Sequence, residues 1–168
     1  MARPSSRDPQ RTYHNTALLL PSGQVLVGGH APISTLDTFN FTIPGGFTED
    51  FRNPSFEIYN PPYMYWGPQP TITSVSGNFA RGATVTLATP EASNIASVVL
   101  VRNTALTHLV DGDQRTVELP VTSRSNGNLQ VSVPSSDAVL PPGPYMLFIN
   151  RRTAKGLQPS ASVRLALK

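Results

Sequence analysis

The sequence predicts an all-β protein whose larger part is a β-sandwich. Short apolar runs recur from residue 71 to residue 167, and turn residues separate them. The 168 residues include 17 Pro and 12 Gly but only 14% charged residues, a composition that favours many short strands over long helices. A chain of this length is long enough to bury one domain and to carry an appendage.

Seven strands are expected in the sandwich. The stretch 97–101 is almost continuously apolar and predicts a central strand, whereas residues 84–87 and 129–133 alternate, so one face of each should meet water. Tyr145 follows a Pro-Gly turn, which fits either a hydrogen bond across a sandwich corner or an ordinary core position. The expected strands are 71–75, 84–88, 96–101, 115–119, 129–133, 145–150 and 162–167.

The first sixty residues predict a smaller unit. Residues 17–29 form a hairpin pattern around Pro-Ser-Gly, residues 31–53 resemble a loop excursion, and residues 55–59 predict one more strand. Three short strands cannot bury their own faces, so this unit should pack against something outside the chain. The Pro-rich stretch 60–70 is stiff, and we place a domain boundary there, giving domains 1–60 and 61–168.

Charge and cysteine content exclude some functions. The net charge is +3, and the 13 Lys and Arg are scattered rather than gathered into a stripe, which argues against a nucleic-acid partner. No apolar run approaches the roughly 18 residues of a membrane span, and residues 1–10 lack the pattern of a secretion signal. Because the chain has no Cys, any metal site must use His, Tyr or carboxylate ligands.

Four segments, in order and at matching spacing, carry a family resemblance. They are Tyr13-His14 with the apolar hairpin 17–29, then Phe56–Tyr63, then Thr107-His108 with Asp113-Gln114-Arg115, and finally Gly143–Phe148. The chain resembles the C-terminal part of a copper radical oxidase of the galactose oxidase and glyoxal oxidase type. The double Pro before Tyr63 is nearer to the glyoxal oxidase side.

The resemblance implies a fold and a metal site. It implies a remnant of the last kelch propeller blade followed by an immunoglobulin-like (early set) β-sandwich. It also implies that Tyr13 is an axial phenol ligand and proton acceptor, and that His14 and His108 are imidazole ligands of copper. Nitrogen and oxygen ligands of this kind suit tetragonal Cu(II).

The implied activity is the oxidation of primary alcohols or aldehydes by dioxygen, with release of hydrogen peroxide. Relatives of this kind are mostly extracellular. They use a tyrosyl radical on a Tyr crosslinked to Cys, and a chain without Cys cannot form that group from its own residues. The chain alone is therefore expected to be catalytically incomplete. Its expected partner is the missing propeller, in the same parent chain or in a separate polypeptide, and a small alcohol, aldehyde or sugar would be the parent's substrate.

Two other functions stay open. The chain could be a non-catalytic interaction module whose N-terminal strands complete a partner's sheet. It could also be a carbohydrate-binding module in which Trp66, Tyr63 and Tyr65 stack on a sugar, although a cluster of aromatic residues between domains explains the same residues.

The remaining polar candidates have simpler interpretations. Without the resemblance, His14 and His108 would be read as surface histidines on or beside strands, and His30 has no assigned role beyond a loop residue near the site. The cluster Arg151-Arg152 with Lys155 is expected to be a solvated turn. Asp111, Asp113 and Glu118 lack the spacing of a calcium loop, and we predict no calcium site there.

Overall fold

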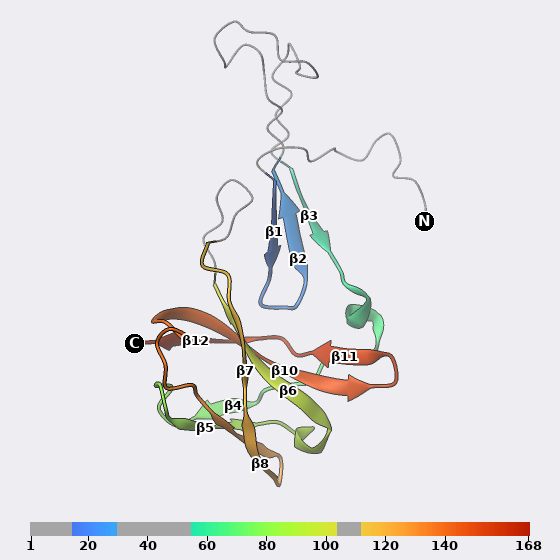
Figure 1. Cartoon of the computed structure of the whole chain (residues 1–168). Coiled ribbons are helices and arrows are strands. Elements are labelled where there is room, and N and C mark those ends of the chain that lie inside the picture. The colour runs from blue at the N-terminus through green and yellow to red at the C-terminus, as the bar shows by residue number, and fades with distance from the viewer. Residues whose placement is uncertain (1–14, 30–54, 104–111) are drawn as a thin grey trace, which may run out of the picture.

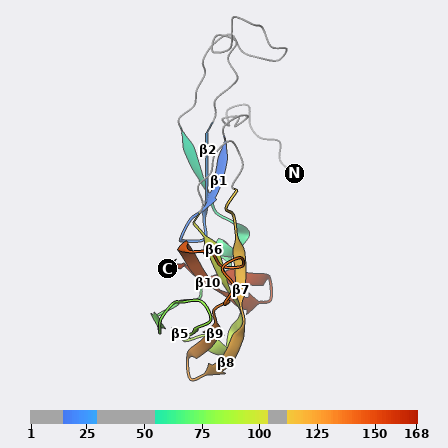
Figure 2. The ribbon, with the colours of Figure 1, turned by 60° about the vertical axis from the view of Figure 1, so that its left-hand side comes forward.

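The computed structural model describes residues 15–29, 55–103 and 112–168. Within these ranges the chain forms strands in three antiparallel sheets and two short 3-10 helices (Figure 1). The predicted all-β class is confirmed. Two of the sheets form a sandwich, and the third rises from one end of it (Figure 2).

The first sandwich sheet is built around one long strand. β10 pairs with β6 on one side and, on the other, with β12 along its first half and β11 along its second half, while β7 pairs with the far side of β6. The bounds are β6 (Ile95–Arg102), β7 (Thr116–Leu119), β10 (Gly143–Thr153), β11 (Gly156–Pro159) and β12 (Val163–Leu167).

The second sandwich sheet has the strand order β4-β5-β9-β8. Burial alternates along β5 and β9, as predicted, because one face packs on the first sheet and the other meets water. The bounds are β4 (Ser74–Ser76), β5 (Thr84–Ala88), β8 (Val121–Ser125) and β9 (Asn128–Ser132), with a 3-10 helix η2 (Ala92–Asn94) before β6.

The hydrophobic core lies between these two sheets. β6 contributes Val98 and Leu100, which are fully buried, and it is paired on both edges, so the predicted central strand is confirmed. The other aliphatic side chains with no exposed surface are Val85, Leu87, Leu129, Val131, Leu140, Leu147 and Ile149. Burial of this kind stabilises the sandwich by roughly 25 cal/mol for each Å² of apolar surface removed from water.

The structure adds two strands that the apolar pattern did not predict. β8 reads Val-Thr-Ser-Arg-Ser and is mostly exposed at a sheet edge, and β11 reads Gly-Leu-Gln-Pro. Both are held by main-chain pairing to a neighbour, which leaves little hydrophobic signal in their own sequence. The first predicted strand, 71–75, is shorter and later, as β4 at 74–76.

The third sheet contains β1 (Thr16–Leu19), β2 (Val25–Gly28) and β3 (Phe56–Tyr59) in that order. The predicted hairpin is confirmed, and hydrogen bonds between Leu20 and Gln24 and from Gly23 to Leu20 close it. Gly23 has a φ of +89°, a conformation that side chains with a Cβ rarely adopt.

A compact connector follows the third sheet. The 3-10 helix η1 (Pro62–Tyr65) lies in the Pro-rich stretch between β3 and β4. A Pro at the start of a helix fits because its missing N–H needs no partner there. The domain boundary at residues 60 and 61 stays a prediction.

Candidate functional site

The three candidate copper ligands, Tyr13, His14 and His108, lie outside the described residues, as does His30. Among the residues that the structure describes, no group of three or more His, Cys, Asp or Glu side chains is placed to hold a metal ion. The structure therefore describes only the elements next to these residues in sequence. They are β1, which follows Tyr13 and His14, and the ends of β6 and β7, which flank the segment with His108.

The turn between β1 and β2 is hydrogen-bonded to the rest of the molecule. The Tyr63 hydroxyl in η1 donates to the Gly23 carbonyl, and the Gln69 side-chain amide donates to the Ser22 and Pro159 carbonyls at 3.1 Å each. The backbone N–H of Ser162 donates to the Pro21 carbonyl at 2.7 Å. Two segments distant in sequence, the connector and residues 159–162, thus hold one turn. We call this set of contacts the turn anchor.

A buried amide joins the connector to the long strand pair β10–β11. Gln158 is fully buried, and its Nε2 donates to the carbonyls of Tyr63 at 3.1 Å and Gly67 at 2.9 Å. Its Oε1 accepts from Arg151 at 2.5 Å, and Arg151 also donates to the Pro68 carbonyl and to Glu91. A buried amide with all these partners is stabilising, whereas one without them would cost free energy.

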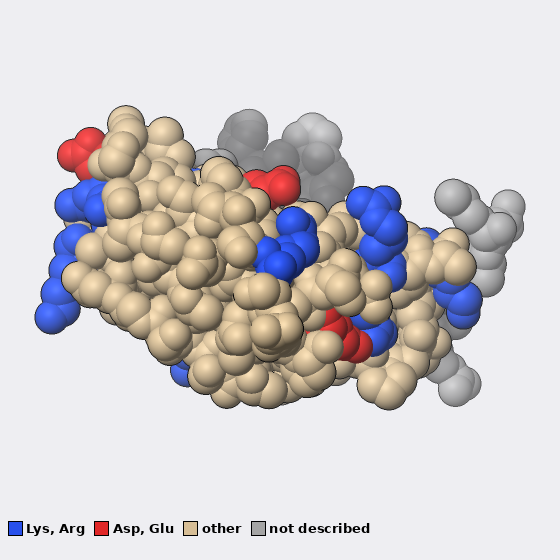
Figure 3. All heavy atoms as spheres, turned by 90° about the horizontal axis from the view of Figure 1, so that it is seen from below, with Lys and Arg blue, Asp and Glu red and all other residues tan. Residues whose placement is uncertain are grey.

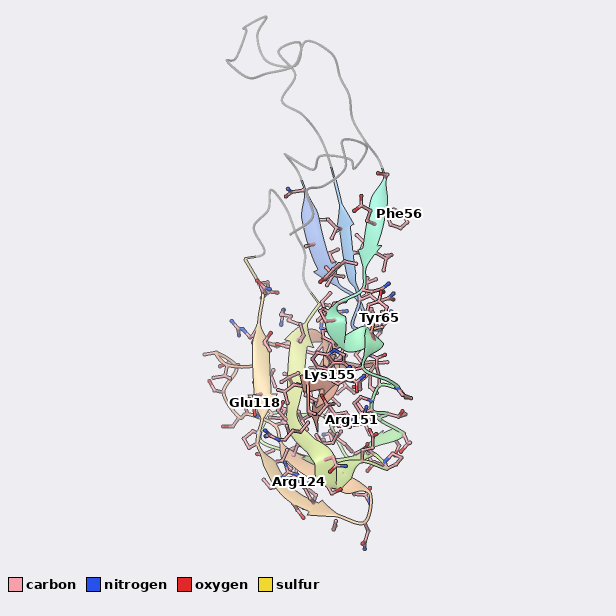
Figure 4. The ribbon with its side chains drawn as sticks, turned by 90° about the vertical axis from the view of Figure 1, so that its right-hand side faces the viewer. Phe56, Tyr65, Glu118, Arg124, Arg151 and Lys155 are labelled. Atoms are coloured by element: carbon pink, nitrogen blue, oxygen red, sulfur yellow. The ribbon has the colours of Figure 1, made fainter. Side chains whose placement is uncertain are left out.

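Arg151 corrects one prediction from the sequence. Its side chain is only 20% exposed and lies within the network around Gln158, so it is not a solvated turn residue. Arg152 and Lys155 are exposed, as predicted. Figure 4 shows Arg151 and Lys155 on the same side of the molecule as the connector that carries Tyr65.

The aromatic residues of the connector do not share one exposed face. Trp66 is half-buried against the β10–β11 turn, where a Cβ on Gly156 would come within 3.2 Å of its ring. Tyr63 is half-buried in the turn anchor, and burial raises its pKa, with a smaller contribution from nearby Tyr59. Tyr65 alone among the three is exposed, at 71%. These positions match an aromatic cluster between two units better than a sugar-stacking platform.

The base of the segment with His108 is held by one arginine. Arg102 ends β6, and its Nε donates to Asp113 Oδ2 at 2.5 Å. Its Nη1 donates to the carbonyls of Pro141 at 3.2 Å and Pro142 at 2.8 Å, and to the Tyr145 hydroxyl at 3.0 Å. The pKa of Arg102 is raised, first by the hydrogen bond with Tyr145 and also by Asp113.

Tyr145 is both a core residue and a corner residue. It is fully buried, and its hydroxyl donates to the Pro141 carbonyl at 2.8 Å, four residues upstream. Asp113 pairs with Arg102, and Glu118 is exposed on β7. Asp111 lies outside the described residues.

Sequence reasoning did not single out Arg102, Gln158 or Gln69. Arg102 stands at the end of an apolar run, eleven residues before Asp113, and that pairing is visible only once β6 and β7 are adjacent. Gln158, which is buried, and Gln69, which is half-buried, are polar residues in Pro-containing segments, where nothing local marks them as structural. One sequence signal could have identified them. Pro residues have a carbonyl but no N–H, so Pro-rich segments contain unpaired carbonyls that nearby polar side chains can bind.

Charged side chains are dispersed over the sandwich end shown in Figure 3 rather than collected into one patch. Among the described residues, no helix is long and apolar enough to span a bilayer.

Comparison with known proteins places the chain in a family. Residues 69–162, more than half of the chain, match the galactose oxidase-like early set domain. A galactose oxidase of Gibberella zeae is 32% identical over 147 residues, which cover 83% of this chain and 19% of that protein. An aldehyde oxidase of Arabidopsis thaliana is 26% identical over 162 residues, covering 82% of this chain and 24% of that protein.

A solved structure agrees with these relatives. It is described as a novel fungal alcohol oxidase with catalytic diversity among the AA5 family, in complex with copper. It superposes with a TM-score of 0.73 and 26% identity over 94% of this chain and 31% of that one. The chain thus spans from 19% to 31% of the length of these proteins. The sandwich topology and the match over residues 69–162 together show that this chain belongs to the galactose oxidase-like early set family.

Proposed function

We propose that this chain is the C-terminal part of an oxygen-dependent copper radical oxidase that converts primary alcohols or aldehydes and releases hydrogen peroxide. The observation that carries the proposal is the likeness of 94% of the chain to an alcohol oxidase whose structure contains copper. The chain alone is catalytically incomplete, because it spans only part of such enzymes and has no Cys for the crosslinked radical group.

Tyr13, His14 and His108 are the proposed copper ligands. The end of β6 and the start of β7 lie on the side of the sandwich from which the β1–β3 sheet rises, in both Figure 1 and Figure 2. The four-residue strand β1 is about 13 Å long at roughly 3.3 Å per residue. Residues 104–111, run out and back, can reach at most about 13 Å from the end of β6, which is comparable with the length of β1.

The proposed chemistry divides between the metal and this chain. Copper bound there would supply a one-electron acceptor and a Lewis acid next to the substrate oxygen. Tyr13 would accept the proton of the substrate hydroxyl as a positioned base, and the two imidazoles would bind the metal. The group that takes the second electron must come from outside these residues, since the chain has no Cys.

The missing propeller is the proposed partner. β3 is exposed along its whole length, with Phe56 65%, Ile58 40% and Tyr59 55% exposed. Successive side chains of a strand point to opposite faces, so apolar groups of β3 stand on both faces of the sheet. A sheet that exposes apolar side chains on both faces is suited to lie between two neighbours, as a kelch blade does. An extracellular location and small alcohol, aldehyde or sugar substrates belong to the same proposal.

Copper binding tests the ligand assignment. We would titrate the chain with Cu(II) and follow it by electron paramagnetic resonance, comparing His14→Ala and His108→Ala with the matched control His30→Ala. The expected result is one tetragonal nitrogen and oxygen site that both ligand substitutions weaken and the control leaves unchanged. Equal binding by all four proteins would remove the assignment. In the assembled parent, the three side chains should meet at about 2 to 2.5 Å from one point.

The second candidate function is a non-catalytic module that adds strands to a partner. It is favoured by the edges of β1 and β3, which have no partner strand among the described residues. This reading predicts that the chain binds a partner sheet through β1 or β3 while copper binding is no stronger than in the His14→Ala, His108→Ala double variant. A monodisperse monomer with fully protected β1 and β3 amides would count against it.

A further inference from the structure

One face of the sandwich is built from uncharged polar side chains. It is the outer face of the sheet β4-β5-β9-β8, whose inner face contributes Val85, Leu87, Leu129 and Val131 to the core. Successive side chains of a strand point to opposite faces, so the residues that alternate with these four point outward. Every outward residue of the four strands is Ser, Thr, Asn, Gln or Ala.

The strand register arranges these side chains in rows across the sheet. One row consists of Ser76, Thr86, Gln130 and Ser123. The next row consists of Ser74, Ala88, Asn128 and Ser125. Neighbours within a row are about 4.8 Å apart, and the two rows are about 6.7 Å apart along the strands. We call these two rows the hydroxyl face.

The hydroxyl face carries no ionic group. Arg124 is the one charged residue in the four strands, and its partner across the sheet is Leu129, an inward position. Its Nη2 donates to the Ile95 carbonyl at 3.2 Å, so the guanidinium is directed away from the hydroxyl face. Lys, Arg, Asp and Glu are the residues most often found at protein surfaces, which makes a sheet face without any of them unusual.

The hydroxyl face is accessible. Its sheet lies on the side of the sandwich away from β1–β3 in Figure 1 and Figure 2, and Figure 3 shows a broad area without Lys, Arg, Asp or Glu on that side. Ser76, Ser123 and Gln130 are exposed. Within the described part of the chain, Asn128 alone among these side chains bonds to protein, donating to the Asn126 carbonyl at 3.2 Å. The other hydroxyl and amide groups keep their hydrogen-bonding capacity for solvent or a ligand.

The chemistry of the hydroxyl face selects one class of ligand. A nucleic acid or an anionic membrane would meet no cation there, and an apolar protein surface would meet only Ala88. Hydroxyl and amide groups both donate and accept hydrogen bonds, which suits an uncharged ligand that is itself rich in hydroxyl groups. A polymer of such units can contact several positions of the two rows at once, so that individually weak contacts reinforce one another.

We propose that the hydroxyl face binds a neutral polysaccharide chain laid across its two rows. The binding uses hydrogen bonds and no ion pair. This surface is separate from the aromatic residues of the connector, Tyr63, Tyr65 and Trp66, and it lies away from the β1–β3 sheet through which we propose that the propeller binds. The inference involves no metal and does not rest on the proposed function.

Affinity electrophoresis of the full chain tests the inference. Native gels would contain hydroxyethyl cellulose, soluble starch or galactomannan, which are neutral, or carboxymethyl cellulose, which is anionic. The variant is Ser123→Ala with Gln130→Ala, and the matched control is Ser93→Ala with Asn94→Ala, which also removes one hydroxyl and one amide from exposed positions. All three proteins should have the same melting temperature, because the substituted side chains have no protein partners among the described residues.

At least one neutral polysaccharide should retard the unmodified chain and the control equally. The variant should bind that polysaccharide about fivefold or more weakly, since two side-chain hydrogen bonds are lost. Retardation should persist at roughly 0.5 M salt, because no charge takes part.

Three results would overturn the inference. The first is no retardation by any of the neutral polysaccharides. The second is retardation by carboxymethyl cellulose alone that disappears with salt, which would assign binding to the net charge of +3 rather than to the hydroxyl face. The third is equal retardation of the variant and the control, which would place the sugar on another surface.

Discussion

At the scale of single residues, several buried or half-buried polar side chains donate to the carbonyls of Pro-rich segments. Each Pro contributes a backbone acceptor but no N–H donor, so a chain with 17 Pro has an excess of acceptors. Tyr145 donates to Pro141, Arg151 to Pro68, and Gln69 to Pro159. Side-chain donors therefore supply hydrogen bonds that backbone N–H groups supply in an ordinary turn.

Tyr145→Phe should destabilise the chain. The substitution removes a hydroxyl that donates to Pro141 and accepts from Arg102, in a side chain with no solvent exposure. A lost buried hydrogen bond that leaves a partner unsatisfied costs about 1 to 3 kcal/mol. Chemical denaturation with Tyr65→Phe as the control measures the difference, because Tyr65 is 71% exposed. Equal stability of the two variants would show that the corner hydrogen bond contributes nothing.

Tyr63 gives the turn anchor a pH dependence. Burial raises the pKa of Tyr63 above its ordinary value, so the unfolded chain loses this phenolic proton at a lower pH than the folded chain. The contribution of Tyr63 to stability is present below the unfolded pKa of about 10 and is lost as pH rises through the folded pKa.

The matched variant is Tyr63→Phe, which removes the titrating group. The difference in unfolding free energy between the two proteins should be constant from pH 7 to about pH 9 and should shrink above about pH 10. Denaturation curves across this range check it. If the difference in unfolding free energy grows above pH 10, the pKa of Tyr63 is not raised by folding.

At the scale of elements, β10 belongs to two assemblies. Its first half pairs with β12 inside the sandwich, and its second half pairs with β11, which reaches the connector. β11 contacts η1. Gln158 on β11 donates to the carbonyls of Tyr63 in η1 and of Gly67 just after it. One strand therefore links the hydrophobic core to the joint that holds the β1–β3 sheet.

Gln158→Met should weaken that joint while keeping the volume of the side chain. The change leaves the carbonyls of Tyr63 and Gly67 without their donor and leaves Arg151 without one acceptor, at a cost of about 1 to 3 kcal/mol. Gln130→Met is the matched control, since Gln130 is an exposed residue of β9. Limited proteolysis should cut the connector faster in Gln158→Met than in the control, and identical cleavage rates would refute the role of the buried amide.

The elements differ in how well the sequence predicts them. The strands at 84–88, 96–101 and 129–133 were predictable because their burial follows from their own apolar pattern. β8 and β11 were not, because a polar edge strand and a Gly-Leu-Gln-Pro strand depend on neighbours that are distant in sequence. The same limit applies to the joint, since the two carbonyls that accept from the Gln158 amide nitrogen belong to residues more than ninety positions away.

The candidate site was predictable only as far as the ordered family motifs reach. The family assignment is confirmed, whereas Tyr13, His14 and His108 stay predictions because they lie outside the described residues. Arg102 carries no motif of its own, because a single Arg acquires a role only from the Asp113, Pro142 and Tyr145 groups that folding brings to it.

At the scale of the whole molecule, a closed sandwich carries an open sheet. The sandwich buries its apolar residues between two layers, but β3 leaves Phe56, Ile58 and Tyr59 exposed. Figure 4 shows Phe56 on β3 at the end of the molecule away from the sandwich. Exposed apolar side chains on a sheet whose edges no described strand covers favour association with another surface.

The isolated chain should therefore self-associate, and the double substitution Phe56→Ser with Ile58→Thr should reduce it. Sedimentation velocity over a range of protein concentrations measures the weight-average mass. Val139→Ser is the control, because Val139 is 47% exposed but lies on the sandwich rather than on the open sheet. If the unmodified chain has the mass of a monomer at every concentration, the exposed apolar side chains of β3 do not cause association.

The joint around Gln158 has a consequence for where this protein can be divided. The family match runs from residue 69 to residue 162, which suggests a natural place to cut out the sandwich. Such a fragment would lack Tyr63 and Gly67, the two acceptors of the Gln158 amide, and it would also lack β12, which begins at Val163. The segment that matches the family is thus shorter than the segment that keeps all strands and the Gln158 hydrogen bonds. A fragment designed to fold should begin before η1 and continue through Leu167.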